Sequence, residues 1–272
     1  MSQRIISLTT DFGLGDHYAG AMKGVILGIN PDATIVDISH SVQSFDVLDA
    51  ALTISQAYEH FPANTIHIVV VDPGVGTSRR PLLVSTGRHA FVAPDNGVLS
   101  LVYDQAERIS ARHITAEHYF LQPVSQTFHG RDIFSSVAGH LSKGVEFAKF
   151  GDEITDFVRF AAPRPKAAGN ILKGVVLRAD KFGNLVTNFT PEDVPQLLNA
   201  SGAPFTIRVG KGVVNKMVSA YAECVPGEVF AIMGSMGFLE ISCNRSSAAM
   251  LLGVGKGAEV EIMLEPGQNP QA

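Results

Sequence analysis

The sequence predicts an α/β N-terminal domain with a mainly parallel sheet, followed by a smaller, barrel-like all-β domain. In the first part, apolar runs alternate with segments whose apolar residues recur at helical spacing, which is typical of βαβ units. In the last part, short alternating runs are separated by turn residues, which indicates a small barrel. Between them lie two prolines among small residues. We therefore expect domains at 1–162 and 170–268, joined by a linker at 163–169.

The N-terminal domain is expected to begin with a strand, a glycine-rich loop and a helix. Strands are expected at Ile5–Thr10, Thr34–Ile38, Val69–Val71, Leu82–Thr86 and Ala90–Ala93, and helices over about residues 19–29, 47–58 and 133–141. Asp46 precedes the second helix and is its expected N-cap. The residues Pro94-Asp-Asn-Gly97 are typical of a turn.

The second domain is expected to contain only short strands. They are predicted at Leu172–Leu177, Leu185–Phe189, Phe205–Val209, Val213–Val218, Glu228–Ile232, Phe238–Ser242 and Val260–Leu264. Two polar loops between them, 180–188 and 234–238, are candidate binding loops, and ordinary hairpin turns are the alternative interpretation.

Acidic residues and a histidine follow the ends of three N-terminal strands. Asp11 and Asp16 follow the first strand, His40 follows the second and Asp72 the third. Because the carboxyl ends of parallel strands meet at one edge of a sheet, where ligands bind, we expect a site there. The glycine-rich loop matches neither GxGxxG nor a P-loop, so a dinucleotide or triphosphate ligand is not favoured.

The third strand gives the strongest local signal. A β-branched apolar run ends in Asp72-Pro-Gly-Val-Gly, and Arg79 and Arg80 follow the turn. Asp-Pro-Gly also forms turns, so a turn-capping role for Asp72 is the alternative. His129 lies before Gly130 at a flexible bend, and a lone loop histidine is usually only solvated. Its functional interest depends on its meeting Asp72 and Arg79.

Composition excludes several classes of protein. The 272 residues are 46% hydrophobic and 17% charged, with a net charge of −5. No basic cluster is longer than Arg79-Arg80, which argues against a nucleic-acid partner. No signal-peptide or membrane-span pattern is found, so we expect a cytoplasmic protein without a membrane partner. Cys224 and Cys243 form no CxxC pair and are expected to be buried thiols.

Five motifs, taken in order across nearly the whole chain, resemble one known family. They are Thr-Thr-Asp11-Phe-Gly, Asp72-Pro-Gly-Val-Gly-Thr, Thr-Phe-His129-Gly, Asp180-Lys-Phe-Gly-Asn184 and Ser235-Met-Gly-Phe-Leu-Glu-Ile. Together they resemble the S-adenosylmethionine (SAM) hydroxide adenosyltransferases, the hydrolytic relatives of fluorinases and chlorinases. The resemblance implies an α/β domain, a β-barrel domain, and a homotrimer with SAM sites at subunit interfaces. It implies SAM as the substrate, with no cofactor and no metal.

The resemblance also implies roles for individual residues. Asp72, Arg79 and His129 match the family's water-activating trio. The implied substrate-binding residues are Asp11 at the ribose diol, Asp16 and Asp180 near the methionine portion, Phe182 and Asn184 on the adenosine side, Ser235 at the methionine carboxylate, and Phe128.

Differences from the halide-using relatives favour water as the nucleophile. Those relatives carry an aromatic hydroxyl at the position of Asp72, a serine at Gly130, and an inserted loop that is missing after Arg80. Met236 stands where some relatives have a basic residue, which bears on how the methionine carboxylate is held.

The chemistry of this prediction is hydrolysis of SAM to adenosine and L-methionine. The sulfonium makes methionine a good leaving group from C5′, and the main requirement is an oxygen nucleophile made from water, whose pKa is about 15.7 in bulk. Arg79 beside the water would stabilise developing hydroxide, Asp72 would orient that arginine, and His129 would accept the proton.

Two other functions stay open at this point. One is a metal-dependent hydrolase that uses Asp11, His40, Asp72 and His129, which activity surviving exhaustive chelation would exclude. The other is a non-catalytic SAM or adenosine sensor, which predicts tight binding without turnover.

Overall fold

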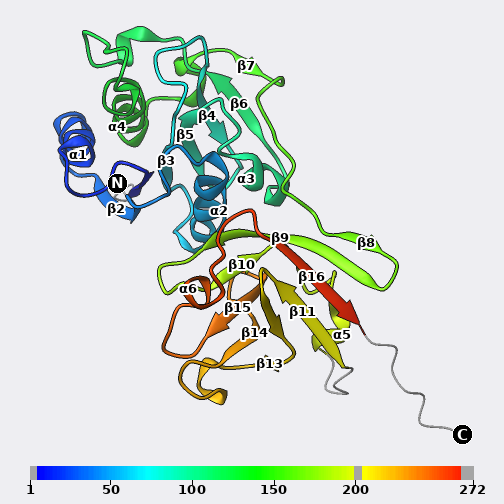
Figure 1. Ribbon diagram of the computed structural model, residues 1–272. Helices are drawn as coiled ribbons and strands as arrows, with labels where there is room; N and C mark the ends of the chain where they lie inside the picture. The colour runs from blue at the N-terminus through cyan, green and yellow to red at the C-terminus, as the bar shows by residue number, and fades with distance from the viewer. Residues whose placement is uncertain (1–4, 199–203, 265–272) are drawn as a thin grey trace, which may run out of the picture. The chain divides into compact units, whose positions relative to one another are not determined.

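The computed structural model describes residues 5–198 and 204–264 (Figure 1). The chain divides into two compact units, one up to Ala162 and one from Pro163 onward. Each unit has its own sheet and its own hydrophobic core.

The first unit is built on a seven-stranded sheet in the order β2-β1-β3-β5-β4-β6-β7. Its strands are β1 (Ile5–Thr10), β2 (Thr34–Ser39), β3 (Ile66–Val70), β4 (Pro81–Ser85), β5 (Ala90–Pro94), β6 (Ser110–His113) and β7 (Glu153–Ile154). The pairs β1–β2, β1–β3 and β3–β5 are parallel, whereas β5–β4, β4–β6 and β6–β7 are antiparallel.

The sheet is therefore mixed, and the expectation of a mainly parallel sheet holds only for its β2-β1-β3-β5 half. The reason lies in the link between β4 and β5. Thr86 donates its N–H to the carbonyl of His89 at 3.0 Å, and Gly87 has a φ of 82°. A turn this short can join only antiparallel neighbours, because a parallel pair needs a long crossover.

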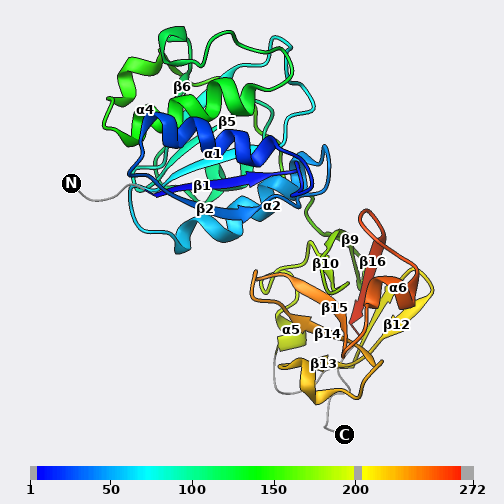
Figure 2. The same cartoon turned by 90° about the vertical axis from the view of Figure 1, so that its left-hand side faces the viewer.

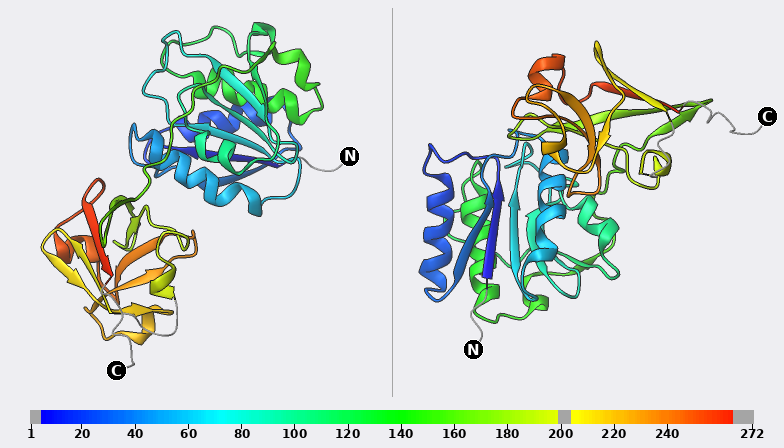
Figure 3. Two further views of the ribbon diagram at one scale, coloured as in Figure 1. Left: turned by 90° about the vertical axis from the view of Figure 1, so that its right-hand side faces the viewer. Right: turned by 90° about the horizontal axis from the view of Figure 1, so that it is seen from below.

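Helices cover both faces of this sheet, as the right-hand view of Figure 3 shows. Helix α1 (Tyr18–Ile29) and helix α4 (Ser136–Ser142) lie on one face, in front of the strands in Figure 2. Helix α2 (Val47–Ala57) and helix α3 (Ser100–Gln105) lie on the other. The helical segment expected at about 133–141 begins earlier, because a π-helical turn over Gly130–Ser135 leads into α4.

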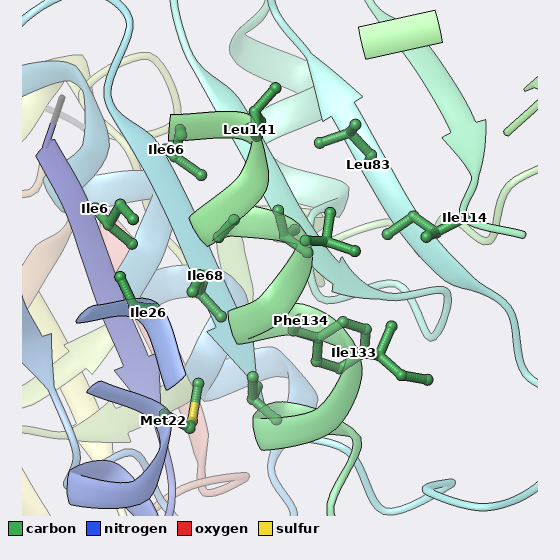
Figure 4. Close-up of a cluster of buried hydrophobic side chains, with 14 of the residues drawn as sticks. Ile6, Met22, Ile26, Ile66, Ile68, Leu83, Ile114, Ile133, Phe134 and Leu141 are labelled. Atoms are coloured by element: carbon green, nitrogen blue, oxygen red, sulfur yellow. The ribbon is translucent and has the colours of Figure 1, made fainter. Parts of the chain in front are cut away.

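Successive apolar residues of β3 point alternately into the two hydrophobic cores on opposite faces of the sheet. Ile66 and Ile68 of β3 point toward α1 and α4, where they meet Met22 and Ile26 of α1 and Phe134 (Figure 4). Val69 and the following Val71 belong to the opposite core, with α2 and α3. β3 is buried on both faces, and its residues are apolar except for His67. The expected cap of α2 is confirmed, because Asp46 Oδ1 accepts from the Asp49 N–H at 3.1 Å.

The second unit is a nine-stranded sheet that curls into a half-barrel (Figure 1). Its strands are β8 (Lys166–Ala168), β9 (Ile171–Ala179), β10 (Leu185–Thr187), β11 (Phe205–Val209), β12 (Gly212–Val214), β13 (Met217–Val218), β14 (Val229–Met233), β15 (Leu239–Cys243) and β16 (Glu259–Leu264). The run expected as one strand over Val213–Val218 is two strands, and two short helices, α5 (Pro195–Leu198) and α6 (Ala248–Leu252), accompany the sheet. The barrel-like expectation is thus met by a curled open sheet.

The segment 163–169, expected as a linker, includes β8, which pairs with β9. The expected domain end at residue 268 lies outside the described residues. Within residues 5–198 and 204–264, no helix combines the length and apolarity needed to cross a bilayer.

Three buried polar side chains, those of Ser7, His67 and His89, contact one another in a row on the α2 side of the first sheet. Ser7 Oγ lies 2.6 Å from His67 Nδ1, and His67 Nε2 lies 3.4 Å from His89 Nδ1. The His67 ring also stacks on Phe91 at 5.0 Å. Burial, and next the neighbouring His89, lowers the pKa of His67 to about 3. The native state therefore holds His67 neutral.

This burial predicts acid sensitivity of the first unit. In the unfolded chain His67 titrates near 6.5, so its contribution to stability is complete above that pH and is lost as the pH falls toward 3. Between pH 7 and pH 5 the free energy of unfolding should fall by about 2 kcal/mol through this group. Urea unfolding at each pH measures this fall in the free energy of unfolding. Hydrogen exchange in peptides from β1 and β3 measures it at the strands that carry Ser7 and His67.

His67→Gln, which cannot be protonated, should flatten this pH dependence even if it lowers stability overall. His60→Gln, at an exposed histidine, is the matched control and should leave the slope unchanged. Equal slopes in the wild type and His67→Gln would show that His67 does not carry the effect.

Candidate active site

A cavity of about 370 Å³ opens where the carboxyl ends of β1 and β3 meet the start of the π-helical turn. Its walls come from Asp11, Phe12, Tyr18, Ser44, Phe45, Val70, Asp72, Val75, Thr127, Phe128, His129 and Gly130. A cavity of this size can hold a small molecule or part of one. It lies at the edge of the sheet where the sequence predicts a site.

Arg79 joins two of the residues on the cavity wall. Its Nε donates to Asp72 Oδ1 at 3.1 Å, and its Nη2 donates to Asp72 Oδ2. Nη2 also lies 2.7 Å from His129 Nδ1. The side chains of Arg79 and Asp72 are only 9% and 5% exposed, so this is a buried, bidentate ion pair. The structure thus brings together the three residues that the sequence singles out.

The loop after β3 delivers Arg79 back to Asp72. Val75 donates its N–H to the carbonyl of Asp72 at 3.2 Å, which closes a tight turn. Gly76 then adopts a φ of 77°, and a Cβ there would overlap the carbonyl of Gln126. A glycine is required at this position, because it provides both the left-handed backbone and the close approach to the loop that carries His129.

The hydrogen bond from Arg79 fixes the protonation state of His129. Arginine can only donate, so Nδ1 of His129 accepts and the ring proton is on Nε2. Burial, and next the charge of Arg79, lowers the pKa of His129 below its usual value, against a weaker opposite effect of Asp72. The imidazole is therefore neutral beside the ion pair.

Arg80, the next residue, binds different partners. Its Nε donates to Asp95 Oδ2 at 2.9 Å and its Nη1 to Asp156 Oδ1 at 2.8 Å. Asp95 also accepts from the N–H of Val158 at 2.7 Å. These contacts hold residues 156–158 against the rest of the first unit, and neither Arg80 nor Asp95 lines the cavity.

Asp11 is held by a strained neighbour that the sequence did not reveal. Its Oδ2 accepts from the N–H of Phe45 at 2.8 Å, and both residues line the cavity. Phe45 has a φ of 65° and is 75% exposed. A left-handed, exposed phenylalanine is unfavourable on both counts, and such residues concentrate at functional sites. In the sequence, only the position of Phe45 after the end of the second strand indicated that it could lie at the site.

Two residues that the sequence places at this edge of the sheet are not among the residues that line the cavity. Asp16 is exposed and is not on the cavity wall. His40 is buried, with Nδ1 at 2.8 Å from Thr10 Oγ1 and Nε2 at 3.1 Å from Asp37 Oδ1, and its carbonyl accepts from Gly13 at 2.7 Å. His40 therefore holds the glycine-rich loop and does not face the cavity.

This placement bears on the metal alternative. The set Asp11, His40, Asp72 and His129 is not assembled, because His40 is turned to Thr10 and Asp37. Across the described part of the chain, no cluster of three or more histidine, cysteine or acidic side chains is placed to hold a metal ion.

Other wall residues also escaped the sequence analysis. They are Phe12, Tyr18, Ser44, Phe45, Val70, Val75 and Thr127. Phe12 and Tyr18 flank the glycine-rich loop, and both make ring contacts with Phe128. The sequence placed Phe12 inside a motif without giving its ring a role.

Side chains within the polar loop between β9 and β10 of the second unit hydrogen-bond to its backbone and to one another. Asp180 Oδ1 accepts from the N–H groups of Phe182 at 2.9 Å and Asn184 at 2.8 Å, and Oδ2 accepts from Asn184 Nδ2 at 2.8 Å. Phe182 projects from this loop and is 77% exposed. Ser235 is exposed on a separate loop. Cys224 and Cys243 are free, buried thiols, as expected.

A buried acid in this unit was also missed. Glu240 of β15 is 6% exposed, and its Oε2 accepts from the Tyr221 hydroxyl at 3.2 Å. Burial raises the pKa of Glu240. A Cβ on Gly234 would overlap its carboxyl group, so Glu240 supports the loop that carries Ser235.

Taken together, the first unit is an α/β domain with a buried Asp-Arg-His trio at a small-molecule cavity. Residues 6–151 match the N-terminal domain of the SAM hydroxide adenosyltransferases, and residues 174–261 match their C-terminal domain. The chain belongs to this family.

Individual relatives agree with this assignment. The (R)-S-adenosyl-L-methionine hydrolase of Salinispora tropica is 34% identical over 94% of this chain and 97% of its own. The fluorinase of Nocardia brasiliensis is 26% identical over 95% of this chain and 96% of its own. An uncharacterized conserved protein from Thermotoga maritima has a similar crystal structure, with a TM-score of 0.87, 37% identity, and coverage of 95% of this chain and 99% of that one.

Proposed function

We propose that the protein hydrolyses SAM to adenosine and L-methionine by attack of water on C5′. The observation that carries the proposal is the buried Asp72–Arg79–His129 trio, two members of which line the cavity. Family membership and the relatives named as SAM hydrolases support the same reaction.

The proposed step is a single displacement. A lone pair of the water oxygen forms the C5′–O bond, the C5′–S bond breaks, and its electron pair stays on sulfur as a neutral thioether. The water gives up one proton, so SAM and water yield adenosine, methionine and H⁺. Because sulfonium is already a good leaving group, the protein needs only to align and activate water.

The geometry suggests how the trio shares this task. Asp72 and His129 lie on the cavity wall, whereas Arg79 lies behind them and is not a wall residue. We propose that water contacts Asp72 and His129, and that Arg79 holds the two groups in place and balances the carboxylate charge. Proton uptake at His129 Nδ1 would require the 2.7 Å contact with Arg79 to open, whereas Asp72 can accept a hydrogen bond from water directly.

The same geometry favours water over a halide. A carboxylate on the wall repels an anion and attracts the hydrogens of water. Asp72 stands on that wall, and Gly130 contributes no hydroxyl at the position where the halide-using relatives carry a serine. Residual halide use would therefore be weak.

Roles for the remaining site residues follow the family resemblance. In this proposal Asp11 binds the ribose diol, Phe128 contacts the substrate, and Asp16 and Asp180 serve the methionine portion. Phe182 and Asn184 serve the adenosine side, and Ser235 serves the methionine carboxylate. The hydrogen bond from Phe45 to Asp11 supports the first of these roles, because it fixes one carboxylate oxygen and leaves the other for the substrate.

The proposal includes catalysis without a metal or other cofactor, in the cytoplasm. Activity that survives exhaustive chelation would separate it from a metal-dependent hydrolase. Release of adenosine and methionine, detected by mass spectrometry, would separate it from a non-catalytic SAM or adenosine sensor.

Isotope labelling tests the direction of attack. In oxygen-18 water, the label should appear in the 5′-hydroxyl of adenosine and not in methionine, because water is proposed to attack C5′. Mass spectrometry of both products measures it. Label in methionine, or S-adenosylhomocysteine as a product, would contradict the mechanism.

The two adjacent arginines provide a matched pair of variants. Arg79→Ala should lower kcat by about 10²–10³, the usual effect of losing a charged hydrogen bond at a reacting centre, whereas Arg80→Ala should cost far less. Steady-state kinetics on samples with the same circular dichroism measures the difference. Arg79→Lys, which keeps the charge but not the fork, should stay impaired. Equal losses of kcat in Arg79→Ala and Arg80→Ala would contradict the specific role proposed for Arg79.

We also propose that the active protein is a homotrimer. In this proposal the Asp72 trio of one subunit and the Asp180 loop of a neighbour serve the same substrate, as the family resemblance implies. Cyclic symmetry would repeat one heterologous contact and close the ring. Mixing and reassembling inactive Asp72→Ala and Asp180→Ala subunits should restore some activity, because some interfaces combine two intact halves. Mixtures that native mass spectrometry shows to be mixed, yet that stay inactive, would contradict the shared site.

A further inference from the structure

Three aromatic rings form adjoining walls of the cavity. Phe12, Tyr18 and Phe128 all line it, and each ring contacts the other two. The centroids are 5.5 Å apart for Phe12–Tyr18, 5.9 Å for Phe12–Phe128 and 5.1 Å for Tyr18–Phe128. The corresponding interplanar angles are 49°, 79° and 89°. Rings at such steep angles resemble the sides of a box.

The burial of these rings is uneven. Phe128 is 7% exposed, whereas Tyr18 is 39% exposed and Phe12 is half-buried. A ring that served only the core would be covered by apolar neighbours. Phe12 and Tyr18 instead present aromatic surface at a cavity.

The charges around the box favour a cation. The described residues on the cavity wall include Asp11 and Asp72 but neither lysine nor arginine. His129 is neutral, because its Nδ1 accepts from Arg79. The Phe128 ring already has one cation near it, since the Arg131 guanidinium lies 5.1 Å from its centroid. Aromatic rings attract cations through the negative charge of their faces.

We propose that Phe12, Tyr18 and Phe128 form an aromatic box that holds the sulfonium group of the substrate, and that Phe12 and Tyr18 select a positively charged sulfur over a neutral thioether. This inference rests on the proposed function, because it takes SAM as the ligand. The box recognises the charge and methyl group of the sulfonium, and leaves the activation of water to Asp72, Arg79 and His129.

The chemistry of the reaction gives the box a distinctive kinetic effect. The positive charge on sulfur disappears as the C5′–S bond breaks, so the rings stabilise bound SAM more than the transition state. Loss of a ring should therefore raise KM without lowering kcat. A residue that positions the attacking water would instead lower kcat.

Binding of a charged and a neutral ligand tests the proposal. The charged probe is a SAM analogue in which a protonated N-methyl amine replaces the sulfonium, and the neutral probe is S-adenosylhomocysteine. Tyr18→Leu and Phe12→Leu should each weaken binding of the charged probe about three- to thirty-fold and leave the neutral probe nearly unchanged. Isothermal titration calorimetry measures both. Tyr18→Phe is the matched control, because it keeps the ring, and should bind both probes as the wild type does.

Equal weakening of both probes would show that the rings provide shape alone, and would overturn the proposal. A second series keeps the shape and changes only the charge of the ring face. Phenylalanine with one, two or three fluorines at position 12 should bind the charged probe progressively less well, and unchanged affinity along the series would also overturn it.

These outcomes are distinct from failure of the proposed function. If the wild type released no adenosine from SAM, the hydrolase proposal would fail, while the binding series would still report on the box. If it released adenosine but bound both probes equally in all variants, only the box would fail. In steady-state kinetics, Tyr18→Leu should raise KM at unchanged or slightly higher kcat, and a fall in kcat with unchanged KM would contradict the box.

Discussion

The arrangement of the site in the first unit depends on the contacts of the Arg79 guanidinium. It binds the Asp72 carboxylate through two nitrogens and contacts His129, so one buried cation ties the end of β3 to the start of the π-helical turn. Removing one partner of a buried ion pair leaves an uncompensated charge, which is costly. The close approach at Gly76, which lets the two loops meet, follows from this need.

The mixed sheet is what makes that contact possible. β4 runs antiparallel to β5, and its first residue, Pro81, pairs with Pro94 at the end of β5. The start of β4 therefore lies at the same edge as the carboxyl ends of β3 and β5. Arg79, two residues before β4, arrives beside Asp72. Had β4 been parallel to its neighbours, its start would have been at the opposite edge, and a long crossover would have had to separate Asp72 from Arg79.

The sequence predicted what local patterns determine. Strand β1, the cap at Asp46 and the Asp72 turn follow from apolar periodicity and short-range hydrogen bonding. The antiparallel half of the sheet, the strain at Phe45 and the enclosure of His40 depend on contacts between distant segments, which a single sequence does not display. Residues with functional spacing can thus serve the scaffold, as His40 does.

The charge of the cavity affects both the binding of the substrate and the release of the product. Asp11 and Asp72 each bring a negative charge, Arg79 balances one of them, and His129 is neutral. One negative charge remains without a balancing cation, beside rings that also attract cations. In the proposed reaction a sulfonium enters and a neutral thioether leaves, so the attraction that draws the substrate in is absent for the product. The rings and the unbalanced negative charge therefore hold the neutral sulfur of methionine less strongly than the sulfonium of SAM, which favours release of this product.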